Sequence, residues 1–214
     1  MSRLLNLESP FYRAYSAAAD LVILNGLTLL GCLPLVTAGA SLTACARVVS
    51  GMVREEEGYL LRTWWKVFRG ALAQSLGWWL PVLGLGALGL WESRLLGTTS
   101  SATLGGGLTG LLLAGLVVVL GVLVWLVPLT ADFDNTLRAH LGNAVRLAVG
   151  RLDLTCACLL VLAAPAGVFW LLPVARTAAA WFMVILGVAF AGYLMALLQR
   201  GVMARLRGEA AASR

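Results

Sequence analysis

Five long stretches without a charged residue constrain this chain more than any other feature. Each is at least as long as the roughly 20 apolar residues that a helix needs to cross the hydrocarbon core of a bilayer. Charged residues make up only 12% of the chain, about half of what a soluble domain carries. A surface with so few charges must face lipid rather than water. The uncharged stretches are Leu21–Ala46, Gly70–Trp91, Leu95–Ala131, Leu154–Ala175 and Thr177–Gln199.

A chain that crosses lipid must satisfy its own backbone polar groups, which favours helices over open sheets. In the longest stretch, the polar segment 97–101 is predicted to be a loop. We therefore predict an all-α, polytopic transmembrane helix bundle that forms one integral membrane domain over residues 1–214. About five membrane-spanning helices are expected, joined by short amphipathic cytoplasmic connectors. The predicted helices cover residues 21–46, 70–91, 104–130, 154–173 and 178–199.

The placement of Lys and Arg predicts the orientation of these helices. In a five-helix chain, loops 47–69 and 132–153 and the tail 200–214 lie on one side and hold twelve of the sixteen Lys and Arg residues. Loops rich in these residues stay on the cytoplasmic side of a membrane. The C-terminus is therefore predicted to be cytoplasmic.

The N-terminal side depends on Pro34. Five full crossings, which we favour, place the N-terminus outside. Proline can break a helix, and a re-entrant hairpin around Leu33-Pro34 would instead place the N-terminus inside, with Phe11–Ala19 along the membrane interface. Both arrangements remain open from the sequence.

The tryptophans are interpreted as markers of the two membrane interfaces, where amphipathic rings accumulate. Trp91, Trp170 and Trp181 fall at the predicted outer ends of helices. Trp64 and Trp65 are expected at the inner interface, and Trp125 near the inner end of the third helix.

The first basic loop carries a candidate lipid contact. Arg62, Lys66 and Arg69 follow helical spacing, and Leu61, Trp65 and Phe68 form a parallel apolar stripe. A basic amphipathic helix of this kind lies on a membrane surface with its cations near anionic headgroups. We predict inner-leaflet headgroup contacts for the three cations; the simpler interpretation is a connector without a partner.

Catalytic chemistry is not expected. The helix interiors hold no ionisable side chain, His140 is the single histidine, and no hydrolase or phosphate-binding motif occurs. The cysteines lack the spacing of a metal site. We therefore predict no enzyme activity, no cofactor and no metal.

Two kinds of polar residue need partners. An unpaired amide in hydrocarbon costs several kcal/mol, so Asn25 is predicted either to clamp two helices together or to line a substrate path. Asp132 and Asp134 are expected to cap the following helix or to pair with loop arginines; the alternative is that they coordinate an ion.

Five segments within the first 95 residues carry a family resemblance: Ser9–Arg13, Asp20 to Asn25, Cys32–Ala40, Arg54–Tyr59 and Trp64–Phe68. Together they resemble the YesL family of bacterial membrane proteins. The chain departs from that family at Trp64 and Trp65, where phenylalanine is more common. The resemblance implies a helix bundle in the cytoplasmic membrane, and family members are often encoded beside carbohydrate uptake systems. It carries over no catalytic residue.

These observations together lead to a functional hypothesis. The chain is expected to be a non-enzymatic accessory or scaffold protein associated with carbohydrate uptake; the alternative is a small-solute transporter or channel, with a polar path near Asn25 and Pro34. The expected partners are membrane lipids, a sugar transporter complex and further copies of the chain, but no nucleic acid.

Overall fold

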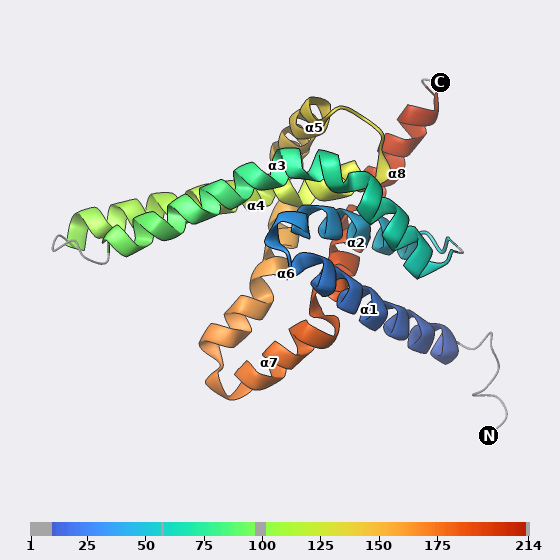
Figure 1. The fold of residues 1–214 in the computed structure, drawn as a ribbon, viewed down its shortest axis with the longest axis horizontal. Coiled ribbons are helices and arrows are strands. Elements are labelled where there is room, and N and C mark those ends of the chain that lie inside the picture. Colours follow the sequence, from blue (N-terminus) through green and yellow to red (C-terminus); the bar gives the residue numbers. More distant parts are fainter. Residues whose placement is uncertain (1–9, 57, 97–101, 213–214) are drawn as a thin grey trace.

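The computed structural model of the chain describes residues 10–56, 58–96 and 102–212. Within these ranges every regular element is a helix, so the predicted all-α class is confirmed (Figure 1). The predicted loop 97–101 lies outside the described residues. The elements are α1 (Pro10–Cys32), a 3-10 turn (Leu35–Thr37), α2 (Ala38–Val53), α3 (Leu60–Leu96), α4 (Ala102–Asp132), α5 (Leu137–Gly150), α6 (Leu152–Leu171), a 3-10 turn (Pro173–Ala175), α7 (Arg176–Phe182), a π-helical turn (Met183–Gly187) and α8 (Val188–Ala212).

Six segments of the described chain are long and apolar enough to cross a membrane, one more than the sequence predicted. They are Tyr15–Cys32, Leu35–Val53, Leu60–Glu92, Gly107–Asp132, Leu152–Leu171 and Pro173–Glu209. The additional segment arises because the predicted helix 21–46 is two helices.

The break in the first uncharged stretch lies at Pro34. Its backbone is extended, with φ −78° and ψ 104°, because proline lacks the N–H that would continue the helix. The Thr37 hydroxyl then lies 2.8 Å from the carbonyl oxygen of Gly31 and 2.9 Å from that of Pro34. The single helix over residues 21–46 was therefore wrong, and Phe11–Ala19 belongs to α1.

Helix α2 is the centre of the molecule. Of its membrane-length segment 61% is buried inside the protein, against 11% to 22% for the other five segments. Small residues make this possible: a Cβ at Gly31 would lie 2.7 Å from the Ser41 hydroxyl, and one at Gly39 would lie 2.8 Å from Trp79. The Ser41 hydroxyl also donates to the carbonyl of Thr28 at 2.8 Å, which ties α1 to α2.

Helix α3 is continuous from Leu60 to Leu96, so residues 60–69 of the predicted loop 47–69 are part of this helix. At about 1.5 Å per residue, its 37 residues exceed the thickness of a bilayer core. Pro81 lies inside α3 without ending it. The helix predicted over 104–130 matches α4 closely.

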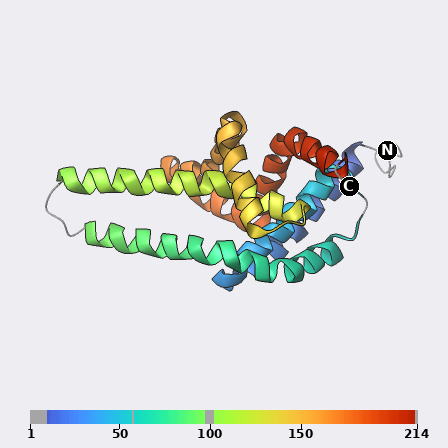
Figure 2. The same cartoon turned by 90° about the horizontal axis from the view of Figure 1, so that it is seen from above.

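The distal halves of α3 and α4 project from the body as a hairpin, which we call the arm (Gly84–Trp91 and Gly107–Val118). Both views show the two helices running side by side away from the rest of the chain (Figures 1 and 2). A Cβ added at six arm glycines would meet nothing within 4 Å: Gly84, Gly86, Gly89, Gly107, Gly110 and Gly115. The arm therefore buries little of its own apolar surface.

The second half of the chain forms a shorter hairpin and a long final helix. Helix α6 descends from the body and α7 returns beside it (Figure 1). The helix predicted over 154–173 corresponds to α6. The one predicted over 178–199 consists of α7, a π-helical turn and α8, and α8 continues to Ala212.

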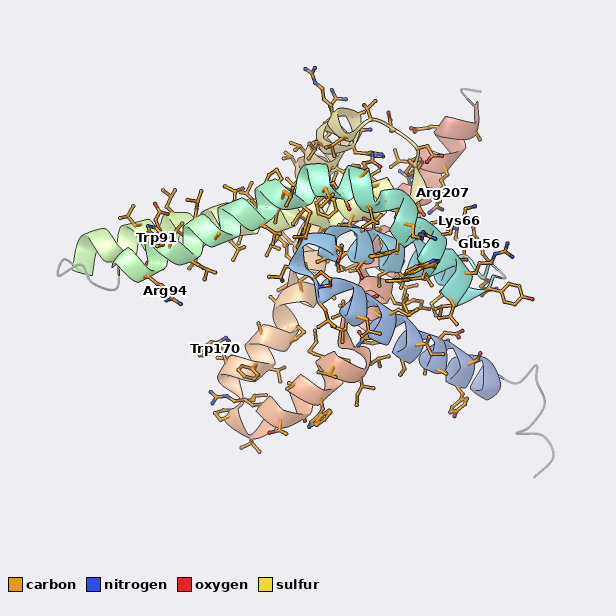
Figure 3. The ribbon with its side chains drawn as sticks, viewed as in Figure 1. Glu56, Lys66, Trp91, Arg94, Trp170 and Arg207 are labelled. Atoms are coloured by element: carbon orange, nitrogen blue, oxygen red, sulfur yellow. The ribbon has the colours of Figure 1, made fainter. Side chains whose placement is uncertain are left out.

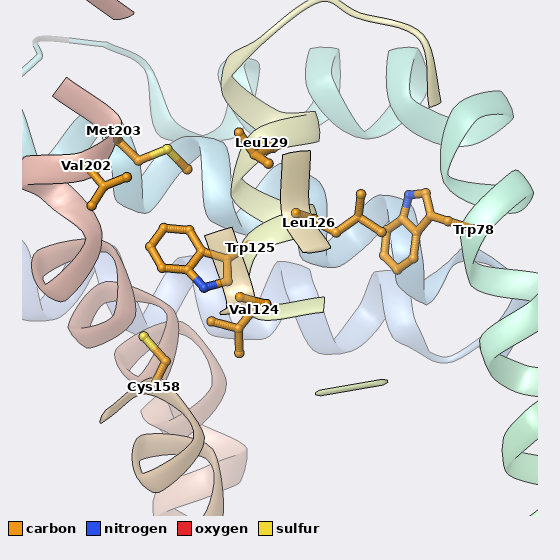
Figure 4. Packing of buried hydrophobic residues seen from close by; sticks show 10 residues of the cluster. Trp78, Val124, Trp125, Leu126, Leu129, Cys158, Val202 and Met203 are labelled. Carbon is orange, nitrogen blue, oxygen red and sulfur yellow. The ribbon is translucent and has the colours of Figure 1, made fainter. Parts of the chain in front are cut away.

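Two of the tryptophans that were assigned to a membrane interface lie in the core instead, which corrects their interpretation. Trp125 has no exposed surface and packs with Val202, Met203 and Cys158 (Figure 4). Its indole N–H donates to the Thr155 hydroxyl at 2.9 Å. Trp64 is also buried, in a second cluster around α2, whereas its neighbour Trp65 is exposed. Aromatic hydropathy alone does not distinguish a protein-facing ring from a lipid-facing ring.

Candidate functional site

A buried carboxylate joins the ends of three helices. Asp132, the last residue of α4, has a side chain that is only 2% exposed. Its Oδ2 atom lies 2.7 Å from Nη2 of Arg207 on α8 and 3.3 Å from Nη1 of Arg54, which follows α2. The Ser50 hydroxyl donates to the same oxygen at 3.0 Å. Hydrogen bonds between charged groups are among the strongest in proteins, so this contact fixes α2, α4 and α8 together.

A second carboxylate, that of Glu56, lies beside this contact and pairs with two of the arginines around it. Glu56 accepts from Nε of Arg54 at 2.6 Å, and Arg47 lies 3.4 Å from Glu56 and 3.8 Å from Asp132. The hydrogen bond from Arg54 holds the pKa of Glu56 below its ordinary value and, in return, raises the pKa of Arg54. Both groups therefore stay charged, although the half-exposed Glu56 is screened by solvent.

We call this cluster (Arg47, Arg54, Glu56, Asp132 and Arg207) the basic end. In Figure 3, Glu56, Lys66 and Arg207 lie on one side of the molecule, while Trp91, Arg94 and Trp170 lie near the tips of the two hairpins. The sequence predicted that Asp132 would pair with arginines or cap a helix, and the structure shows the pairing. The Thr136 hydroxyl instead caps α5, accepting from the Ala139 N–H at 3.4 Å.

A cavity of about 730 Å³ reaches the basic end from the interior. Residues of α2, α3, α4, α6 and α8 line it, and most are aliphatic. The charged residues of its lining are all arginines: Arg54, Arg200 and Arg207. The cavity is therefore apolar along its length and positively charged at one end, which nothing in the sequence pattern indicated.

Asn25 is not part of the cavity lining and has the geometry of an interhelical clamp. Its side-chain Nδ2 donates to the carbonyls of Met183 at 3.2 Å and Val184 at 2.7 Å, and its Oδ1 accepts from the N–H of Ala189 at 3.0 Å. The π-helical turn changes the regular helical hydrogen bonding here, and Asn25 contacts backbone groups in and just after that turn. The fully buried amide joins α1 to α8.

The predicted headgroup cations lie on the first turns of α3. Arg62, Lys66 and Arg69 are all exposed, and the guanidinium of Arg69 lies 5.6 Å from the Trp65 ring centroid. A groove of about 670 Å³ between α1 and α3 is lined by Arg62 and by the Trp64, Trp65 and Phe68 rings. Their contact with headgroups stays a prediction.

Helix α5 is an amphipathic connector of the predicted kind. Leu141, Val145 and Val149 are exposed at four-residue spacing, whereas His140 is buried on the opposite face. Burial lowers the pKa of His140, with a smaller opposing effect from Asp134. No three His, Cys, Asp or Glu side chains of the described chain come together as a metal site.

The architecture defines an all-α bundle with several helices able to cross a membrane. A family model described as a protein of unknown function, DUF624, matches residues 21–92, about a third of the chain. The match covers Asn25, the Pro34 break, all of α2 and most of α3. No curated protein and no solved structure matches the chain.

Proposed function

We propose that this chain is a YesL-like, non-enzymatic accessory or scaffold protein of the bacterial cytoplasmic membrane that works beside a carbohydrate uptake system. The DUF624 match is consistent with the YesL resemblance, and the link to carbohydrate uptake comes from that resemblance. The chain uses its arm to bind another membrane protein and needs no cofactor.

In the proposed orientation the basic end faces the cytoplasm. With six crossings, Arg3 and Arg13 join the twelve inner Lys and Arg residues, leaving Arg94 and Arg176 outside. This distribution follows the positive-inside rule more closely than five crossings do. Both chain ends are then cytoplasmic.

The observation that supports a binding role is that the apolar surface of the arm is not packed against the rest of the described chain. Glycines in membrane helices allow the backbone of a second helix to approach closely, and a Cβ added at any of the six arm glycines would meet nothing within 4 Å in the described part of the chain. Large apolar side chains stand between them, with Leu88 63% and Leu111 70% exposed. Such a surface fits the helices of a partner membrane protein.

Photocrosslinking in intact membranes tests this role. A photoreactive amino acid at Leu88 on the arm is compared with one at Leu160 on α6, which is similarly exposed at 70%. We expect protein adducts from Leu88, containing a transporter subunit, and only lipid adducts from Leu160. Equal adducts from both positions, or lipid adducts alone from Leu88, would contradict the proposal. Adducts with a second copy of the chain would show instead that the arm mediates self-assembly, and the proposed transporter partner would be abandoned.

The alternative of a sugar-conducting path is less well supported. It requires a series of polar side chains around a cavity, but Asn25 is tied to backbone groups and the large cavity is mostly aliphatic. Uptake of a labelled sugar into vesicles containing only this chain would restore that alternative.

A further inference from the structure

The shape and charge of the large cavity fit one class of ligand. We propose that the cavity binds one anionic phospholipid, with an acyl chain among the aliphatic residues and the phosphate at Arg200 and Arg207. This binding does not depend on the accessory role proposed above. It also differs from the headgroup contacts predicted for Arg62, Lys66 and Arg69, which lie on another helix.

The volume and lining fit an acyl chain. Sites for small organic ligands occupy roughly 300–1,000 Å³, and this cavity encloses about 730 Å³. Its lining away from the basic end includes Leu120, Val161 and Val188. Water has few polar partners along this part of the cavity, whereas hydrocarbon packs there favourably.

The charge balance at the cavity end fits a phosphate. Three arginines (Arg47, Arg54 and Arg207) contact the carboxylates of Asp132 and Glu56, and a fourth, Arg200, lines the same cavity. Within the described residues Arg200 has no acidic partner, and Asp132 engages Nη2 of Arg207, leaving other donors of that guanidinium. Two positive charges therefore remain for an anion.

The arrangement of α8 places both arginines along the cavity. Arg200 and Arg207 are seven residues apart, which is two helical turns, so they share one helix face. Met203 and Ala204 lie between them on the same face and also line the cavity. Basic pockets between membrane helices are known binding sites for anionic headgroups.

Native mass spectrometry of the full chain in a neutral detergent tests the proposal. The probes are phosphatidylglycerol and phosphatidylcholine with identical acyl chains. We expect one phosphatidylglycerol to bind about tenfold more tightly than phosphatidylcholine, because the choline cation of phosphatidylcholine is repelled by the arginines while its phosphate is the same. Equal affinity for both lipids would overturn the proposal.

Arg200→Gln and Arg205→Gln form a matched pair on α8. Both arginines are exposed, but only Arg200 lines the cavity. We expect Arg200→Gln to abolish the preference for phosphatidylglycerol and Arg205→Gln to preserve it. An equal loss of this preference in both variants would show that the lipid responds to the general positive charge of α8, and it would overturn the proposed site.

Two further measurements test the contributions of the acyl chain and of the headgroup separately. Ala191→Phe places a ring in the cavity and is expected to weaken phosphatidylglycerol binding while the arginines stay intact; unchanged binding would overturn the placement of the acyl chain. Glycerol phosphate, which has the headgroup chemistry alone, should not compete at lipid concentrations. Effective competition would assign the site to a soluble phosphate and overturn the lipid.

Discussion

The basic end and the arm use similar apolar helices but hold them by different means. At the basic end, α2, α4 and α8 meet through Asp132. At the opposite end of α2, Gly39 lies so close to Trp79 of α3 that there is no room for a Cβ. In the arm, α3 and α4 continue side by side, yet their glycines have open space around them. Ion pairs and close packing thus hold α2 and its neighbours together, whereas the arm has few such contacts with the rest of the described chain.

This difference separates the residues that determine the fold from those available for binding. Lipid is as apolar as leucine, so burying leucine between membrane helices contributes little to their association. Close van der Waals contact, hydrogen bonds and ion pairs must hold them instead. Those contacts concentrate around α2, so substitutions there should affect stability far more than substitutions in the arm.

The largest effect is expected from Asp132→Ala. Removing a buried carboxylate leaves Arg54 and Arg207 facing each other, and breaking such a pair costs about 3–5 kcal/mol. Thermal unfolding in detergent should show a marked loss of stability. Asp134→Ala, at an exposed position, is the control and should change the stability little. Equal losses of stability in the two variants would contradict the stabilising role of Asp132.

A smaller loss is expected from Asn25→Ala. The variant leaves the backbone groups of the π-helical turn without partners, at a cost of about 1–3 kcal/mol. The control is Gln74→Ala, which removes one exposed hydrogen bond to the Asn135 carbonyl. The melting temperature should fall for Asn25→Ala alone, and an unchanged value would argue against the clamp.

Gly39→Ala and Gly86→Ala compare the two regions directly. Overpacking against Trp79 costs about 1–3 kcal/mol, partly offset by the roughly 1 kcal/mol of helix propensity gained over glycine. Gly39→Ala should therefore lower the melting temperature modestly, whereas Gly86→Ala, in open space, should leave it unchanged or raise it. The reverse order would contradict the assignment of packed and bare regions.

The smallest effect is a dependence on pH through His140. Because burial lowers the pKa of His140, the unfolded chain binds a proton more readily than the folded chain. Stability should therefore fall as the pH drops below about 6.5, the ordinary histidine value, towards the lowered pKa. Unfolding midpoints of the wild type and His140→Leu across this range measure the effect, and parallel curves would contradict it.

The sequence predicted the elements that depend on local composition. Stretches without charge identified the apolar helices, because lipid excludes unpaired charge, and α4 and α6 begin and end near their expected residues. Pro34 was recognised as a possible break. Choosing between one full crossing and a hairpin required contacts between segments, such as the hydrogen bond from Ser41 to Thr28.

The parts that the sequence did not predict depend on residues far apart in the chain. Asp132 was expected to find an arginine, but nothing local indicates Arg207, 75 residues later. Asn25 needed a partner, and the π-helical turn that supplies it lies 158 residues away. The cavity is lined by residues from several helices, so no local sequence motif could predict it.

The account depends most on the basic end and the hairpin tips lying on opposite sides of a membrane. Single cysteines at Tyr59, Arg146 and Arg94, in a variant without the four native cysteines, can be labelled with a membrane-impermeant thiol reagent. Tyr59 is exposed beside the basic end and takes no part in its ion pairs. In intact cells we predict labelling at Arg94 alone; in inverted membrane vesicles, labelling at Tyr59 and Arg146. Labelling of Tyr59 and Arg146 from opposite sides would contradict the account.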